Sequence, residues 1–148
     1  MNHSHMHDFE RGPSRPEIHV TDQDWRRLTG LLDVASHRVP ETASAALRAE
    51  LARAIRVPRD IVPPDLVTMN SRVLFDVSGA GPLESTLVYP WDANDLTGRL
   101  SILAPLGTAL LGLSVADSVA WTFPDGVTAN VRVLSVLYQP EASGDRWL

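Results

Sequence analysis

Between residues 21 and 39 the apolar side chains recur at alternating steps of three and four. The residues in this pattern are Trp25, Leu28, Leu32, Ala35 and Val39. Such spacing predicts one narrow apolar seam along a helix of about four turns. Thr21, followed three positions later by the acidic Asp24, has the arrangement of a capping box and predicts where this helix begins.

A second helical pattern follows Pro40, which ends the first helix because proline cannot continue a helix interior. Thr42 or Ser44 is the predicted start of the second helix. Its apolar face holds Leu47, Leu51, Ala54 and Ile55, and the residues largely off that face are Arg48, Glu50, Arg53 and Arg56. Two short helices with facing seams predict an antiparallel helical hairpin over residues 18–57.

From residue 58 onward the apolar period changes from helical spacing to alternation. Three prolines in "VPRDIVPPDLVT" predict an extended linker, because proline disfavours helix in the residue before it. The run "SRVLFDV" alternates, the turn residues "SGAGP" follow, and "LESTLVY" alternates again. These two runs predict a β-hairpin.

The remaining sequence predicts more strands and one short helix. "GRLSIL" is a third strand candidate, and "PLGTALLG" predicts a helix with Pro105 in its first turn and Gly112 at its end. Two alternating runs flank the turn "PDG", and their apolar positions are Val119, Trp121 and Phe123, then Val127, Ala129, Val131, Val133 and Leu137. The predicted fold class is therefore α+β, a short helical hairpin followed by an antiparallel sheet domain with one short helix.

Composition narrows the function classes. The 148 residues have room for one compact domain, and 44% of them are apolar, enough for a core. The net charge is -5, and all 13 basic residues are arginines spread thinly along the chain, so direct nucleic-acid binding is not expected. The absence of cysteine excludes disulfides and thiolate metal sites.

Two segments bear on localisation. The N-terminal "MNHSHMHDFERGPSRPE" lacks the apolar stretch of a secretory signal, and residues 100–117 are apolar but interrupted and too short to span a membrane. We therefore expect a cytoplasmic protein with no membrane partner. Residues 1–17 are predicted to be a disordered tail, in which metal binding by His3, His5 and His7 is left open.

Several separated motifs resemble one family. "IVPPDLVTMNSRVLFD", "STLVYPWDAN", "RLSILAPLGTALLGLSVADSV" and "PDGVTANVRVLSVLYQPEASGD" occur in the order found in regulators of nucleoside diphosphate kinase, relatives of the Gre transcript-cleavage factors. The resemblance spans residues 18–145. It implies a coiled-coil finger over 18–57, an FKBP-like domain over 58–148, and action on bacterial RNA polymerase at its secondary channel.

The resemblance also implies a docking position. In the Gre relatives, the turn that enters the short helix contacts the rim of the polymerase channel, and the matching positions here are Leu103, Ala104 and Pro105, with Leu106 next to them. Only Pro105 keeps the residue type of the Gre pattern, because Leu103 and Ala104 replace an acidic residue and a serine. A more apolar contact is therefore expected.

The finger departs further from the Gre pattern. Gre factors deliver acidic residues at the tip of a long coiled coil to help hold a catalytic Mg²⁺. The tip residues here are His37, Arg38, Val39, Pro40 and Glu41, of which only Glu41 is acidic. Helices of about 15 residues extend only about 22 Å. The sequence therefore predicts a polymerase-binding regulator that does not stimulate cleavage, is not an enzyme, and uses no cofactor and no metal.

One alternative belongs to another class. FKBP-like domains include prolyl isomerases and peptide-binding modules with aromatic pockets, and the rings available here are Tyr89, Trp91, Trp121 and Phe123. A proline-peptide isomerisation assay distinguishes this alternative. Direct contact with nucleoside diphosphate kinase is left open, because it follows only from the family name.

Overall fold

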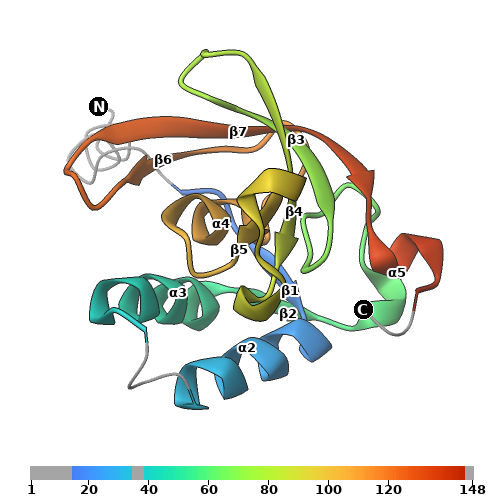
Figure 1. The fold of residues 1–148 in the computed structure, drawn as a ribbon. Coiled ribbons are helices and arrows are strands. Elements are labelled where there is room, and N and C mark those ends of the chain that lie inside the picture. Colours follow the sequence, from blue (N-terminus) through green and yellow to red (C-terminus); the bar gives the residue numbers. More distant parts are fainter. Residues whose placement is uncertain (1–14, 35–38, 146–148) are drawn as a thin grey trace, which may run out of the picture.

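The computed structural model describes residues 15–34 and 39–145, and α2, α3 and α4 lie on one side of a curled sheet (Figure 1). The helices are α2 (Asp22–Val34), α3 (Glu41–Arg53), α4 (Pro105–Leu110) and α5 (Pro140–Ser143), with the 3-10 turns η2 (Arg59–Ile61), η3 (Pro90–Asp92) and η4 (Asp95–Thr97). The strands are β1 (His19–Thr21), β2 (Ile55–Val57), β3 (Arg72–Val77), β4 (Pro82–Val88), β5 (Arg99–Ser101), β6 (Ser118–Thr122) and β7 (Thr128–Tyr138). This combination confirms the α+β class.

The main sheet has the strand order β5-β4-β3-β7-β6. β3 pairs antiparallel with β4, and β6 pairs antiparallel with β7, so both predicted hairpins are confirmed. β5 instead pairs in parallel with β4, and the prediction of a purely antiparallel sheet is wrong at this edge. The chain between these strands passes through η3 and η4, which gives the length that a parallel connection requires.

Most alternating positions face the core as predicted. The buried ones are Val73, Phe75, Val119, Trp121, Val131 and Val133. Val127 and Leu137 are exceptions, with exposed fractions of 58% and 43%. Val127 precedes β7, and Leu137 lies where the β3–β7 register shifts between the pairs Arg72↔Tyr138 and Val73↔Val136. A bulge of this kind breaks strict alternation and turns a side chain outward.

Helix α2 begins where the capping pattern predicts. The amide of Asp24 donates a hydrogen bond of 3.0 Å to Thr21 Oγ1. Leu28 and Leu32 are fully buried, whereas Trp25 is only partly buried. Ala35, the next position of the predicted seam, lies outside the described residues, and Val39 follows the helix rather than belonging to it.

Helix α3 corrects three predictions. It begins at Glu41, directly after Pro40, rather than at Thr42 or Ser44. Glu50, expected largely off the apolar face, is buried, and its charge is compensated by ion pairs with Arg15 at 2.9 Å and Arg53 at 3.0 Å. Ile55, expected on that face, has left the helix.

Ile55 instead begins β2, which pairs in parallel with β1. Its side chain is 41% exposed. The amide of Ile55 donates to the carbonyl of Ile18 at 2.9 Å, and the amide of His19 donates to Gly112 at 3.2 Å. This small sheet therefore ties both ends of the helical hairpin to the segment that follows α4.

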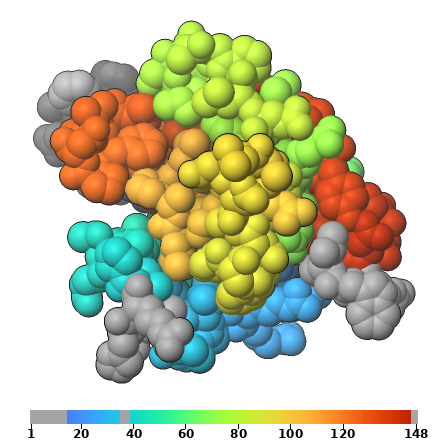
Figure 2. All heavy atoms as spheres, in the orientation of Figure 1, coloured from blue at the N-terminus to red at the C-terminus, as the bar shows by residue number. Residues whose placement is uncertain are grey.

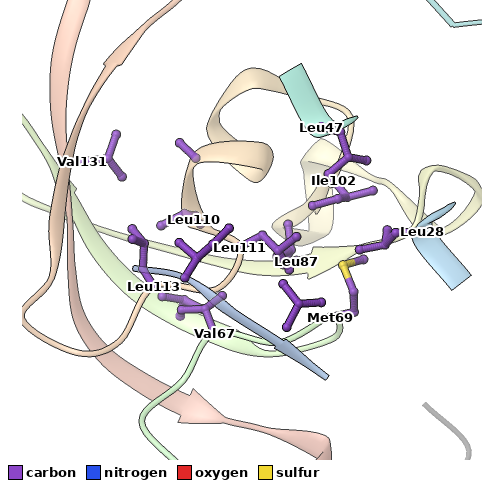
Figure 3. Packing of buried hydrophobic residues seen from close by; sticks show 14 of the residues in the cluster. Leu28, Leu47, Val67, Met69, Leu87, Ile102, Leu110, Leu111, Leu113 and Val131 are labelled. Carbon is purple, nitrogen blue, oxygen red and sulfur yellow. The ribbon is translucent and has the colours of Figure 1, made fainter. Parts of the chain in front are cut away.

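One hydrophobic cluster joins the helical hairpin to the sheet (Figure 3). Leu28 and Leu47 from the hairpin belong to the same cluster as Ile102, Leu110 and Met69. Helix α3 also packs against α4. The hairpin is therefore packed against the sheet domain over part of its length, and it does not project freely from that domain. Within the described ranges, no helix is both long enough and apolar enough to cross a membrane.

Candidate interaction groove

An apolar groove of about 960 Å³ opens between the helical hairpin and the sheet. Figure 2 shows α3, α4 and the end of β6 around a hollow on one face of the molecule. The hairpin contributes Leu31, Val39, Pro40, Thr42, Ala43 and Ala46; the other lining residues are Pro90, Trp91, Leu103, Ala104, Pro105, Thr108, Trp121, Thr122, Phe123 and Pro124. We call this feature the apolar groove, because its described lining contains no charged side chain.

The turn before α4 forms one wall of the apolar groove and is held by hydrogen bonds. The amide of Leu103 donates to Ser101 Oγ at 3.1 Å, and the amide of Ala104 donates to the Ser101 carbonyl at 3.0 Å. Thr108 Oγ1 donates to the Ile102 carbonyl at 2.7 Å. The wall is therefore a preformed surface with few ways to rearrange.

Gly107 explains how the turn packs so closely. A Cβ atom placed on Gly107 would lie 2.2 Å from the Ser101 carbonyl oxygen, a distance that no real contact reaches. Only glycine lets the first turn of α4 rest on the end of β5. Pro105 occupies the first helical turn, as predicted, and Gly112 follows the helix with a φ of 81°, in the left-handed region that favours glycine.

The structure brings most of the two predicted site segments together. Leu103, Ala104 and Pro105 line the same apolar groove as Val39 and Pro40. Leu106, the fourth residue of the predicted docking turn, instead packs against the hydrophobic core and lies outside the described lining. Of the other predicted tip residues, Glu41 is exposed at the start of α3, and His37 and Arg38 lie outside the described residues.

Three of the four rings named from the sequence line the apolar groove. Trp121 is buried, Phe123 is partly buried, and Trp91 is 70% exposed at the edge. Tyr89 is buried behind Trp91, and the two rings stack with centroids 5.1 Å apart and planes 4° apart. Tyr89 therefore supports the groove wall without forming it.

The edge of the apolar groove is acidic. Glu41, Asp92 and Asp125 are all exposed and follow lining residues directly in the sequence. Arg15 is a basic group beside the groove, and its guanidinium lies 5.2 Å from the Trp121 ring centroid and is paired with Glu50. Arg27 lies near Tyr89, behind Trp91. In the described parts of the chain no cluster of three or more His, Cys, Asp or Glu is placed to hold a metal ion.

Comparisons with known proteins assign the two halves of the chain. Residues 16–57 match the family described as Rnk N-terminus, and residues 62–138 match the C-terminal family of the transcription elongation factors GreA/GreB. The regulator of nucleoside diphosphate kinase from Escherichia coli K12 is 45% identical over 133 residues, which cover 89% of this chain and 97% of that protein. This chain belongs to the regulator of nucleoside diphosphate kinase family.

More distant relatives place the family among the Gre factors. A transcription elongation factor GreA from Pelobacter propionicus is 31% identical over 94 residues, 63% of this chain and 59% of that protein. A solved structure named prokaryotic transcription elongation factor GreA/GreB from Nitrosomonas europaea is 42% identical, with a TM-score of 0.65 over 84% of this chain and all of that chain. The relatives carry the names of regulators and elongation factors, not of catalysts, and this chain is a regulator of that kind.

A buried polar group lies where α2 meets the sheet domain. Asp24 is buried, and its carboxylate accepts a hydrogen bond of 3.1 Å from the amide of Met69. Burial, and then the nearby negative charge of Glu141, raise the pKa of Asp24 to about 7 in spite of that bond. Burial also raises the pKa of Tyr89, and the nearby Arg27 guanidinium opposes that rise.

The sequence did not predict that the separate site segments form one groove. It named the turn at Leu103 and the tip at Val39 as separate sites, because each pattern is local and the distance between them depends on how the hairpin packs. Pro90 and Thr122 carry no sequence signal of their own. The exposed Trp91 was available as a signal, since a tryptophan next to Pro90 and Asp92 in a turn-like segment is unusual for a core position.

Proposed function

We propose that this chain is a cytoplasmic transcription regulator that binds bacterial RNA polymerase at the rim of its secondary channel without stimulating transcript cleavage. In this proposal the sheet domain is the FKBP-like docking body of the Gre relatives, and the apolar groove is its contact surface. The observation that supports it is the convergence of Leu103, Ala104 and Pro105 with the hairpin residues Val39 and Pro40 around one uncharged groove.

The physical argument for a contact surface is its exposure. Apolar side chains from the helical hairpin and from three segments of the sheet domain surround a hollow that remains open to water, and such a surface is more typical of a binding site than of a free face. The turn is held by Ser101 and Thr108, so little conformational freedom is lost when a partner docks.

The absence of cleavage stimulation is proposed from length and chemistry. Helices α2 and α3 have 13 residues each in the described structure, which corresponds to about 20 Å. Part of that length lies against the sheet domain, because Leu28 and Leu47 belong to its core. Glu41 is the one acidic residue of the predicted tip, whereas carboxylates must act together to hold a second Mg²⁺.

A variant that separates binding from folding tests the proposal. Ala104 occupies the N-cap of α4, where aspartate is a favoured residue, so Ala104→Asp should keep or raise the melting temperature. The same substitution places a carboxylate in the apolar groove, which a partner must desolvate. We expect retention of the variant by immobilised core polymerase to fall at least tenfold.

The matched control is Leu96→Asp, because Leu96 is 97% exposed and lies outside the described lining. Retention of this control should equal that of the parent protein. A backtracked elongation complex saturated with the parent protein should show only its intrinsic cleavage rate, and a Gre factor added to it should cleave less. Failure of the parent protein to bind polymerase, or cleavage above the intrinsic rate, would contradict the proposal.

The aromatic lining favours one second candidate, a peptide-binding or prolyl isomerase module. Trp91, Trp121 and Phe123 line the apolar groove together with Pro40, Pro105 and Pro124. A proline-containing peptide substrate tests catalysis directly. We expect no isomerisation above the uncatalysed rate, and a rate that scales with protein concentration would favour this candidate over the polymerase proposal.

A further inference from the structure

The chemistry around Trp91 goes beyond an apolar contact. Trp91 is 70% exposed at the edge of the apolar groove, and it stacks on Tyr89 with nearly parallel planes. Tyr89 is itself buried, so one face of the Trp91 ring packs against the protein. The exposed part of the ring is therefore available to a partner, and the stacking contact with Tyr89 favours the observed orientation.

The structure already contains a cation over a neighbouring ring of the same groove. The guanidinium of Arg15 lies 5.2 Å from the centroid of Trp121, a distance at which the negative face of an indole attracts a cation. Arg15 also pairs with Glu50 at 2.9 Å, so its charge is compensated within the protein. Trp121 thus already has a cation over its ring, whereas among the described residues no arginine makes such a contact with the Trp91 ring.

The charges at the edge favour the same kind of occupant. Asp92 directly follows Trp91, and Glu41 and Asp125 directly follow the lining residues Pro40 and Pro124. All three are exposed, and within the described residues none of them forms a salt bridge within 4.0 Å. An uncharged groove with carboxylates at its edge complements a segment that is apolar in its centre and positive at its flanks.

We propose that the apolar groove receives a segment of a partner protein that combines apolar anchor side chains with a lysine or arginine, and that this cation lies over Trp91 beside Asp92. The inference rests on the proposed function in one respect, since both use the same groove. It adds the chemistry of the partner segment and two residues, Trp91 and Asp92, that recognise it.

A pair of synthetic peptides tests the proposal without polymerase. One has a leucine and phenylalanine core flanked by lysines, and the other has the same core flanked by glutamates. Each carries a fluorophore, and binding to the full chain is followed by anisotropy at increasing salt. We expect the lysine-flanked peptide to bind and to weaken as salt rises, and the glutamate-flanked peptide to bind at least tenfold more weakly.

Variants of the two residues locate the cation. Trp91→Ala should weaken the lysine-flanked peptide about threefold to tenfold, and Trp91→Phe should fall between, because phenylalanine attracts cations less than tryptophan does. Asp92→Asn should slow association and reduce the dependence on salt. Leu96→Ala is the matched control, an exposed apolar side chain from the same loop but outside the described lining, and it should bind like the parent protein.

The outcomes are separable from those of the proposed function. Equal binding of the two peptides, binding of neither, or identical behaviour of Trp91→Ala and Leu96→Ala would overturn the inference, even if polymerase is retained. If the lysine-flanked peptide binds as expected while polymerase is not retained, the inference stands and the proposed function fails.

Discussion

Asp24→Asn should make the protein more stable at alkaline pH and should change its stability little in acid. The carboxylate of Asp24 is buried against Met69, and its pKa rises from 3.8 to about 7 mainly because burial disfavours the charged form. The folded protein therefore holds this proton more tightly than the unfolded chain does. Asparagine keeps an oxygen that accepts the Met69 amide but carries no charge.

The sign and size of the effect follow from proton linkage. Because the folded pKa is the higher one, the stability from this group is complete below about pH 4, is lost as pH rises through the interval up to about 7, and stays lost above it. The folded and unfolded pKa values of Asp24 differ by about three, and each pKa unit corresponds to about 1.4 kcal/mol. The unfolding free energy of the parent protein should therefore fall by about 4 kcal/mol across this pH interval. The charged groups facing Asp24 are Glu141, which adds to the effect, and Arg27, which opposes it.

Chemical denaturation of the parent protein and Asp24→Asn from about pH 4 to about pH 8 measures the effect. The difference in unfolding free energy should grow in favour of the variant as pH rises. Asp22→Asn is the control, because Asp22 lies in the same helical turn but in a partly exposed pair with Arg56 at 3.1 Å, where less than about 1 kcal/mol is expected. A difference that is constant with pH, or that grows as pH falls, would refute the reasoning.

Two further predictions concern packing. Trp25→Ala should lower the unfolding free energy by about 2–3 kcal/mol in urea denaturation, because the partly buried ring donates from Nε1 to the Leu51 carbonyl at 3.2 Å; an unchanged midpoint would contradict this contact. Gly107→Ala should cost about 1–3 kcal/mol since its Cβ has no room, whereas Gly30→Ala in α2, with nothing within 4 Å, should stabilise by up to about 1 kcal/mol. If both alanine variants shift the melting temperature in the same direction, the close approach of α4 to β5 is wrong.

The fold was predictable where a local period is long enough to be read. The alternation of Val73 and Phe75, and of Val119 and Trp121, predicted their strands and the buried face of each. β1 and β2 have three residues each, which is too short for alternation to show. The parallel pairing of β5 depends on the path of the connection and has no local signature.

The candidate site was predictable residue by residue but not as a surface. Pro105 and Val39 were each named from local patterns, and the groove that joins them exists only because Leu28 and Leu47 bury the hairpin against the sheet domain. The burial of Glu50 was not predicted either, because an i,i+3 pair with Arg53 also occurs on exposed helix faces and the second partner, Arg15, is 35 positions away in the sequence. A charged residue in a helical pattern is predicted to be exposed, because such residues are seldom buried without a partner that compensates the charge.

The packing of the hairpin connects the apolar groove to the proposed lack of cleavage stimulation. Val39 and Pro40 form a wall of the groove because the end of the hairpin lies beside the α4 turn. A hairpin that projected fully from the sheet domain would carry these residues away from Leu103 and would open the groove to water on that side. The same residues cannot both close the groove and extend toward a distant metal ion. In our proposal the hairpin therefore contributes to a docking surface. Leu28 and Leu47 in the shared core, and the hydrogen bond from the Met69 amide to Asp24, hold the hairpin against the sheet domain, and a hairpin held in this way does not deliver acidic residues to a distant metal ion.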